Sequence, residues 1–166
     1  MTHATTWGDR AKDAALIPAR IALGATMLYH GTAKLSGEGP QQTGQMFEGL
    51  GLKPGKALAI ATGLAETFAG AAAVLGIATR PAALAVLVTQ TLAISKVHAP
   101  RGFDVMKGGM EFNLALIAIA AGLLLAGPGR ISAHELLEHR VEGRGARGLW
   151  RKARPSGLSR AVRVMA

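Results

Sequence analysis

The chain alternates long apolar runs with short polar connections, and each run is close to the length that crosses a membrane. Four such runs stand out, about 16–21 residues each, at 14–34, 57–77, 81–98 and 111–126. They are predicted to be helices, because the strict alternation of barrel strands is absent and open sheet edges do not occur in lipid. The pattern therefore predicts an all-α fold, a transmembrane four-helix bundle.

The connections between these runs indicate how the helices are arranged. Residues 79–81 leave almost no loop between the second and third runs, which predicts an antiparallel helical hairpin. The other two connections, 36–56 and 99–110, are longer and rich in glycine and proline, and residues 42–50 of the first could form a short interfacial helix. An even number of spans places both termini on one side of the membrane and these two loops on the other.

The composition agrees with a membrane protein. Hydrophobic residues make up 49% of the 166 and charged residues only 17%, compared with about 25% charged residues in soluble domains. Alanine and glycine are plentiful, and such small residues let membrane helices pack closely, within one chain or in a homo-oligomer. The chain has no cysteine, which excludes a disulfide, a thiolate metal site and a dithiol relay within it.

The distribution of basic residues predicts the orientation. Arg10, Lys12 and Arg80 share a side with the segment from Arg130 onward, which holds nine basic and three acidic residues and supplies +6 of the net charge of +9. Because basic residues accumulate on the cytoplasmic side of membrane proteins, both termini are predicted to be cytoplasmic.

The sequence divides into three predicted parts: a cytoplasmic head at 1–13, a membrane domain at 14–132, and a basic tail at 133–166 that is interfacial or partly disordered. Ser132 followed by Glu135 fits a capping box that opens a short helix in the tail. The charge of the tail suits anionic lipid headgroups or acidic soluble partners. No nucleic-acid-binding fold or aromatic platform accompanies this charge, so no nucleic acid is expected as a partner.

Glu66 lies in the middle of the second run, where an ionised carboxylate would cost at least a few kcal/mol without a partner or water. The rise of a helix places Gln90 of the third run at nearly the same depth. His30 and Lys34 lie near the outer end of the first run, and His98 lies at the outer end of the third. The polar residues that begin the fourth run at this outer end are Glu111 and Asn113.

This convergence predicts a polar site in the outer half of the bundle. Glu66, His30 and His98 are the candidate catalytic residues, because a carboxylate in a low dielectric and a nearby imidazole can exchange protons. Cationic and amide side chains could orient the carbonyl oxygens of a quinone. The residues predicted to bind the substrate or quinone are Lys34, Gln90, Glu111, Asn113 and Arg20.

Most of these residues also have a structural interpretation. Lys34 and Glu111 could mark helix ends, Arg20 could extend toward the inner interface, His30 could form a hydrogen bond with a backbone carbonyl, and His98 could cap the third run. Glu66 could form a bridge with an arginine or histidine that only ties the bundle together. No metal site is predicted, because no pair of candidate ligands has a dedicated spacing, and the chain has no haem or flavin motif.

A set of short motifs follows in order along the membrane domain. They are His30-Gly31-x-x-Lys34, Gly49-x-Gly51-Leu52, Glu66, Gly76-x-x-Thr79-Arg80, His98, Gly108-Gly109-x-Glu111-Phe112 and Gly127-Pro128-Gly129-x-x-Ser132. Together they resemble the DoxX family of small four-span membrane proteins, over about residues 14–132. The resemblance implies a multi-pass protein of the bacterial plasma membrane, and it adds Arg80 to the candidate binding residues.

The resemblance also implies a redox role. The family takes its name from the membrane subunit of a thiosulfate:quinone oxidoreductase, and related actinobacterial proteins gather soluble redox enzymes in oxidative-stress defence. We therefore expect an integral membrane subunit of a quinone-linked oxidoreductase system, with quinone as its cofactor and partner proteins for electron transfer. The alternative is a non-enzymatic scaffold that recruits soluble redox enzymes through its basic tail, so whether the chain is an enzyme stays open. A solute or proton pathway ranks last, since no internal inverted repeat is evident.

Overall fold

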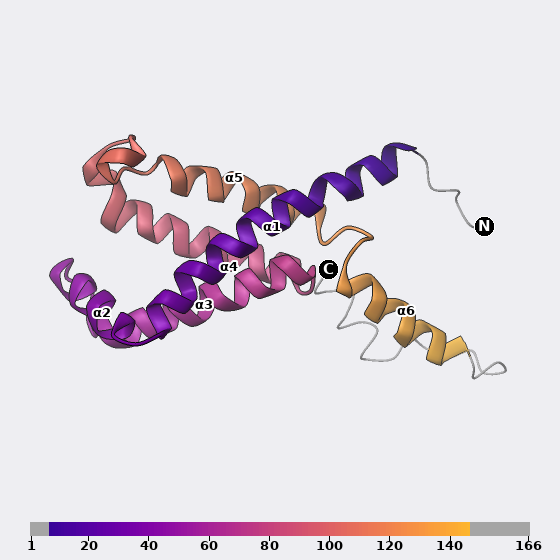
Figure 1. Cartoon of the computed structure of the whole chain (residues 1–166), viewed down its shortest axis with the longest axis horizontal. Helices are drawn as coiled ribbons and strands as arrows, with labels where there is room; N and C mark the ends of the chain where they lie inside the picture. The colour runs from indigo at the N-terminus through magenta and orange to yellow at the C-terminus, as the bar shows by residue number, and fades with distance from the viewer. Residues whose placement is uncertain (1–6, 147–166) are drawn as a thin grey trace.

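The computed structural model describes residues 7–146, and the regular secondary structure of this part is helical. Its α-helices are α1 (Trp7–Leu35), α2 (Gly39–Gly49), α3 (Gly55–Leu75), α4 (Thr79–Ala93), α5 (Glu111–Ala126) and α6 (Ala133–Ala146). A π-helical turn, η1 (Ile94–His98), continues α4 and leads into two 3₁₀ turns, η2 (Ala99–Arg101) and η3 (Val105–Lys107). In Figure 1, α1, α3, α4 and α5 form a bundle. We call the end that carries α2 and the α4–α5 connection the α2 end, and the opposite end the α6 end.

Glycines allow α1 and α3 to pack with their backbones in contact. A Cβ atom added to Gly24 would stand 2.8 Å from the carbonyl oxygen of Gly70. Further along α1, a Cβ atom added to Gly31 would stand 2.8 Å from the carbonyl oxygen of Gly63. The two helices are antiparallel, since the residue number of the contacting glycine decreases along α3 as it increases along α1. Small residues at a helix interface permit this close approach, which brings the side chains of the two helices together at the α2 end.

The core of the bundle is narrow and rich in alanine, whereas many large apolar side chains point outward. Leu64, Phe68 and Val88 are 57%, 50% and 58% exposed, respectively. Water-soluble proteins rarely expose extended apolar surface of this kind, whereas a bilayer would cover it. The buried apolar residues that pack together as one core cluster come from all four long helices and are Leu23, Met27, Ala69, Ala72, Ala82, Ala83, Val86, Leu116, Ala120 and Leu123.

Two helices in the described part are long and apolar enough to cross a membrane, as judged by length and composition. They are α3, with 21 residues, and the continuous helical segment Thr79–Arg101, with 23. The apolar helix α5 is shorter, at 16 residues. The helix α1 has 29 residues, but Arg20, His30 and Lys34 interrupt its apolar stretch. The elements of the described part are all helices, so the predicted all-helical fold class is confirmed. Because two of these helices pass the test for a membrane span, the arrangement in four spans stays a prediction.

The helix positions agree with the predicted runs except at some ends. The helix α5 coincides with the run 111–126, and α3 and α4 begin two residues before the runs 57–77 and 81–98. The largest difference is in α1, which begins at Trp7 rather than at residue 14, so the described part of the predicted head is helical. Hydropathy indicates where a helix lies in hydrocarbon, whereas polar residues can continue the same helix into water.

The short helix predicted for residues 42–50 is present as α2, and it packs on the first turn of α3. A Cβ atom added to Gly44 would stand 2.8 Å from the Cα atom of Lys56. The N–H of Gly55 donates a hydrogen bond to Oε1 of Glu48 (3.2 Å). These contacts hold α2 in a fixed place over one end of α3.

At the α6 end, the guanidinium of Arg20 joins α3 to the α5–α6 connection. Its Nε and Nη2 atoms donate to the carbonyl oxygens of Ala73 and Val74 in the last turn of α3 (2.9 Å each). Its Nη1 atom donates to the carbonyl oxygens of Pro128 (2.9 Å) and Ile131 (2.7 Å). A cation at the C-terminus of a helix also complements the helix dipole. The side chain, with 6% of its surface exposed, acts as a structural link.

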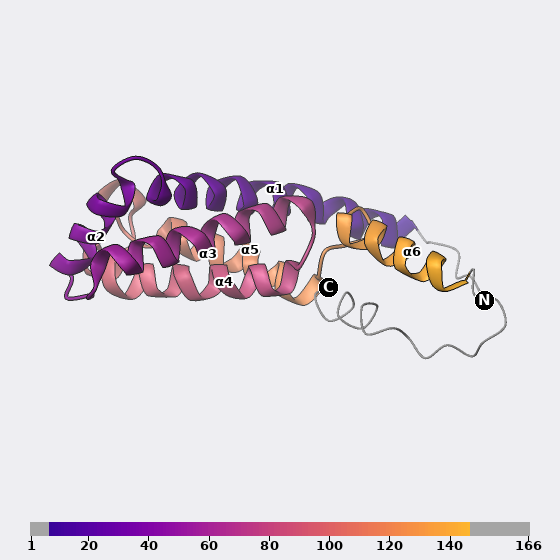
Figure 2. The same ribbon diagram turned by 90° about the horizontal axis from the view of Figure 1, so that it is seen from below.

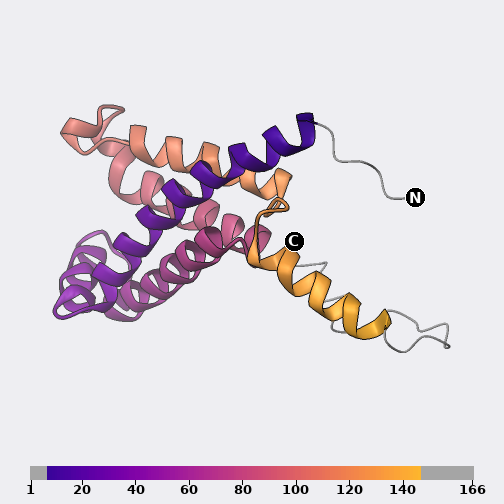
Figure 3. The same ribbon diagram turned by 45° about the vertical axis from the view of Figure 1, so that its right-hand side comes forward.

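The helix α6 begins at a capped residue and lies beyond the ends of α3 and α4 (Figures 2 and 3). Oγ of Ser132 accepts a hydrogen bond from the N–H of Glu135 (3.3 Å), which confirms the N-cap half of the predicted capping box. Leu136 and Leu137 of α6 are 65% and 42% exposed. Most of the basic tail, residues 147–166, lies outside the described residues, and so do residues 1–6 of the head.

Candidate functional site

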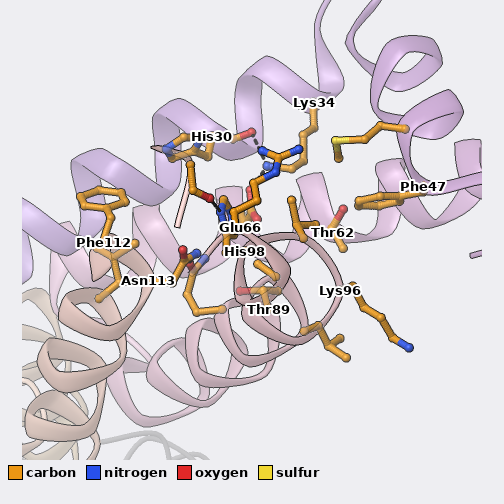
Figure 4. A pocket seen from close by; sticks show the side chains of 18 of the residues that line it. His30, Lys34, Phe47, Thr62, Glu66, Thr89, Lys96, His98, Phe112 and Asn113 are labelled. Atoms are coloured by element: carbon orange, nitrogen blue, oxygen red, sulfur yellow. Dashed lines mark hydrogen bonds and ion pairs between the residues drawn. The ribbon is translucent and has the colours of Figure 1, made fainter. Parts of the chain in front are cut away.

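A cavity of about 520 Å³ lies at the α2 end, between the α1–α3 pair and the α4–α5 pair. Figures 1 and 3 show the two pairs standing apart at this end, and in Figure 4 side chains from both pairs surround the cavity. Its volume is within the range of about 300–1,000 Å³ that is typical of small-molecule sites. Six of the predicted site residues line it: His30, Lys34, Glu66, Gln90, His98 and Asn113.

Lys34 and Glu66 form an ion pair in the wall of the cavity. Nζ of Lys34 lies 2.7 Å from Oε2 of Glu66 and donates a second hydrogen bond to the carbonyl oxygen of His30 (3.2 Å). The two side chains are 20% and 8% exposed, respectively. The close packing of Gly31 on Gly63 brings them within reach of each other. The central carboxylate therefore has a charged partner, and loss of either partner would leave a buried charge uncompensated.

A pair of amide side chains joins α4 to α5 beside the ion pair. Gln90 and Asn113 are 5% and 6% exposed, and Nδ2 of Asn113 donates a hydrogen bond to Oε1 of Gln90 (2.8 Å). Nε2 of Gln90 lies 3.9 Å from the sulfur of Met27, at the distance of a weak hydrogen bond. A buried amide pair of this kind fixes the orientation of both side chains.

His98 is held in place by the loop that follows it. Its Nδ1 atom lies 2.7 Å from the carbonyl oxygen of Gly108. Because a carbonyl can only accept a hydrogen bond, Nδ1 carries the proton of the contact. The residue ends the π-helical turn η1, and turns of this kind are frequent at functional sites. The half-buried ring lies among the other cavity side chains in Figure 4.

The edge of the cavity carries exposed polar side chains. His30 is exposed, and its ring makes a T-shaped contact with the Tyr29 ring at a centroid distance of 5.4 Å. Lys96 and Arg101 also line the cavity and are exposed. In Figure 4 the amine of Lys96 points away from Glu66. The opening of the cavity is therefore basic, whereas its interior holds the paired charges.

Three of the predicted binding residues do not line the cavity. Arg20 is at the α6 end, in the hydrogen bonds described above. Arg80 is exposed, and its Nε atom donates to the carbonyl oxygen of Leu124 (3.3 Å). Glu111 is exposed in the first turn of α5, and its Oε2 atom accepts a hydrogen bond from the N–H of Val105 (3.2 Å). In the structure these three residues form hydrogen bonds with backbone groups, and their predicted role in ligand binding stays a prediction.

The cavity also uses residues that were not predicted as site residues. Phe47 of α2 and Phe112 of α5 contribute aromatic surface, and Thr62 and Thr89 contribute hydroxyl groups. The threonines carry a weak signal in the sequence, since Thr62 is one turn before Glu66 and Thr89 is adjacent to a predicted site residue. The phenylalanines carry none, because an apolar residue in an apolar run is ordinary.

The fold and this cavity define a helical protein of membrane type with a cavity between its long helices. A family model, DoxX, matches residues 15–99, about half of the chain, and the chain belongs to the DoxX family. The family is membrane-associated and often linked to quinone oxidoreductase-related systems. The match ends before α5, so Asn113 lies outside it. Neither a curated protein nor a solved structure matches the chain.

Within residues 7–146, no group of three or more histidine, aspartate or glutamate side chains is placed to hold a metal ion. In the interior of the cavity the two charged groups are paired with each other, the two amides are paired with each other, and most of the wall is apolar. These features suit an uncharged, largely apolar ligand with a few polar atoms.

Proposed function

We propose that this protein is a four-span membrane subunit of a quinone-linked redox system, with its α6 end in the cytoplasm. Support for the four spans comes from the outward-facing apolar side chains of the long helices and from the family. Support for the orientation comes from the excess of basic residues after Arg130. In this orientation the cavity lies in the outer half of the membrane.

The cavity is the proposed quinone site, and the observation that carries this proposal is the Lys34–Glu66 ion pair inside an otherwise apolar wall. A quinone ring is flat and apolar, with two oxygens that need hydrogen-bonding partners. Phe47 and Phe112 would pack on such a ring, and the ion pair and the amide of Asn113 would meet its oxygens. The residues present therefore fit this class of ligand.

A bound quinone would supply the capacity to carry two electrons and two protons. The residues of the chain would supply its binding and the places for protons. Glu66 and His98 are the two groups of the cavity interior that can hold a proton and release it. We place the electron donor on a partner protein, because the chain has no cysteine for a dithiol relay of its own.

The test is the binding of a short-chain quinone analogue to the purified protein in detergent micelles. The variant Glu66→Gln retains the size of the side chain but leaves the amine of Lys34 without its counter-charge. We expect its affinity for the analogue to fall about tenfold or more, the effect of about 1.4 kcal/mol. Lys107→Ala is the control, since that side chain is 78% exposed and does not line the cavity.

Two results would contradict the proposal. One is the absence of saturable binding to the wild-type protein, and the other is an unchanged affinity in a folded Glu66→Gln variant. Thermal unfolding of both variants provides the check that each is folded. The alternative function, recruitment of soluble redox enzymes by the basic tail, stays a prediction because most of that tail lies outside the described residues.

A further inference from the structure

The polar atoms of the cavity are mostly hydrogen-bond acceptors whose neighbouring donors are already used. We propose that the cavity prefers the reduced form of its ligand, a quinol with two hydroxyl groups, over the quinone. This inference rests on the proposed function, because it specifies which redox form the same site binds more tightly. It follows from a count of donors and acceptors around the cavity.

The first acceptor is Nε2 of His98. Since Nδ1 donates its proton to the carbonyl oxygen of Gly108 at 2.7 Å, the neutral ring has no proton on Nε2. Nδ1 is turned to the loop, so Nε2 is the ring nitrogen that remains for the cavity. It can accept a hydrogen bond from a hydroxyl group, whereas it repels the lone pairs of a carbonyl oxygen.

The second acceptor is the carboxylate of Glu66. Its Oε2 atom receives the bond from Lys34, and the same amine also donates to the carbonyl oxygen of His30. The ion pair therefore satisfies most of the donor capacity of Lys34 but leaves Oε1 of Glu66 with no donor among the described residues. A carboxylate oxygen can accept two hydrogen bonds and makes strong ones with hydroxyl groups.

The threonine hydroxyls also favour a ligand that donates hydrogen bonds. Oγ1 of Thr62 donates to the carbonyl oxygens of Leu58 (2.8 Å) and Ala59 (3.0 Å) in its own helix. Oγ1 of Thr89 donates to the carbonyl oxygen of Val86 (3.2 Å). Each hydroxyl hydrogen is used within its helix, so each oxygen presents only lone pairs to a ligand.

The amide pair of Gln90 and Asn113 offers a ligand both donors and acceptors. One N–H of Asn113 is used by Oε1 of Gln90, and its second N–H remains as a donor, as does one N–H of Gln90. Oδ1 of Asn113 has no donor among the described residues and adds one more acceptor. Among the cationic donors, Lys96 and Arg101 are at the exposed edge, and Lys34 in the interior has one N–H left beyond its two bonds. Acceptors therefore outnumber free donors in the interior.

The two redox forms of the ligand respond differently to this environment. A quinone has two carbonyl oxygens and brings no donor, whereas a quinol brings two O–H groups. A quinone would leave Nε2 of His98 and Oε1 of Glu66 unpaired in an apolar site, which is costly. We expect the protein to bind quinol about tenfold more tightly than quinone. By linkage, the bound couple would have a reduction potential ~30 mV more positive than the free couple.

The experiment compares three ligands with the same ring. They are a short-chain naphthoquinone, its quinol kept reduced by borohydride without oxygen, and the dimethyl ether of the quinol. The ether retains the reduced ring but has no hydroxyl hydrogen, so it should bind as weakly as the quinone. Each dissociation constant is measured with the full-length protein in detergent micelles.

Variants of His98 test the assigned acceptor. His98→Asn places an amide N–H where Nδ1 is, so it retains the bond to Gly108, but it has no atom at the position of Nε2. We expect this variant to lose most of the preference for quinol, to within about threefold of equal affinities. His98→Gln, which can place an amide oxygen near the position of Nε2, should retain part of it. Lys107→Ala is the control and should keep the wild-type ratio.

The outcomes separate this inference from the proposed function. If the quinone binds as tightly as the quinol, or if the ether binds as tightly as the quinol, the preference for hydroxyl groups is wrong while the quinone site stands. An unchanged ratio in folded His98→Asn also overturns the assigned acceptor. If none of the three ligands binds, both the proposed function and this inference are wrong.

Discussion

Arg20 carries the most specific stability prediction that the structure supports. The substitution Arg20→Met retains an unbranched apolar stem but removes the guanidinium, and with it four hydrogen bonds of 2.7–2.9 Å. Hydrogen bonds to charged groups contribute about 1.5–3 kcal/mol each. Their full sum is an upper limit, because methionine still packs and because water can reach carbonyl groups near the membrane surface. We expect the free energy of unfolding of Arg20→Met to be lower by about 3–5 kcal/mol, a cost similar to that of breaking a buried charged pair.

The assay is thermal unfolding of the purified protein in detergent micelles, followed by helical circular dichroism. For a chain of this length, each kcal/mol of lost stability lowers the midpoint temperature of unfolding by about 2–4 °C. The midpoint should therefore fall by about 6–20 °C. Arg80→Met is the matched control at the same end of the bundle. Arg80 is exposed and makes one hydrogen bond of 3.3 Å, so its loss should cost less than about 1 kcal/mol. Equal midpoints for the two variants would refute the structural role of Arg20.

Two further predictions concern helix packing and capping. Gly70→Ala would place a Cβ atom 2.6 Å from the backbone nitrogen of Leu28, so α1 and α3 must separate at a cost of about 1–3 kcal/mol. Gly122→Ala is the control, because nothing lies within 4 Å of its added Cβ atom. It should be neutral or stabilising by up to about 1 kcal/mol. Similar midpoints of unfolding for the two variants would contradict the packing argument. Ser132→Ala removes the cap of α6 at a cost of about 1 kcal/mol, so amides in its first turn should exchange about fivefold faster. Unchanged exchange at Glu135 would show that the cap does not stabilise α6.

The helices could be predicted from the sequence because their signals are local. The run 111–126 coincides with α5, and the runs 57–77 and 81–98 begin within two residues of α3 and α4. Hydropathy and turn residues act over neighbouring positions, so they do not depend on how the helices pack. The start of α1 at Trp7 was missed for the same reason, since polar residues can continue a helix that hydropathy does not mark.

The site was predicted only in part. Depth along each helix correctly grouped Glu66, Gln90 and His98 around one cavity. Depth alone could not exclude Glu111, which is at the same end of the bundle but bonds to the backbone of the α4–α5 connection. The direction in which a side chain points depends on the rotation of its helix in the bundle, and packing against the other helices sets that rotation.

The sequence by itself determined that this protein is helical and apolar enough for a membrane, and that a carboxylate in mid-helix requires a partner. Only the tertiary structure decided that the partner is Lys34, because glycine contacts between α1 and α3 set the register that brings the two side chains together. It also decided which nitrogen of His98 remains for a ligand, since a loop that folds back after η1 places the carbonyl of Gly108 beside Nδ1. Both results depend on distances between segments that are far apart in the chain, which local patterns of residues do not contain.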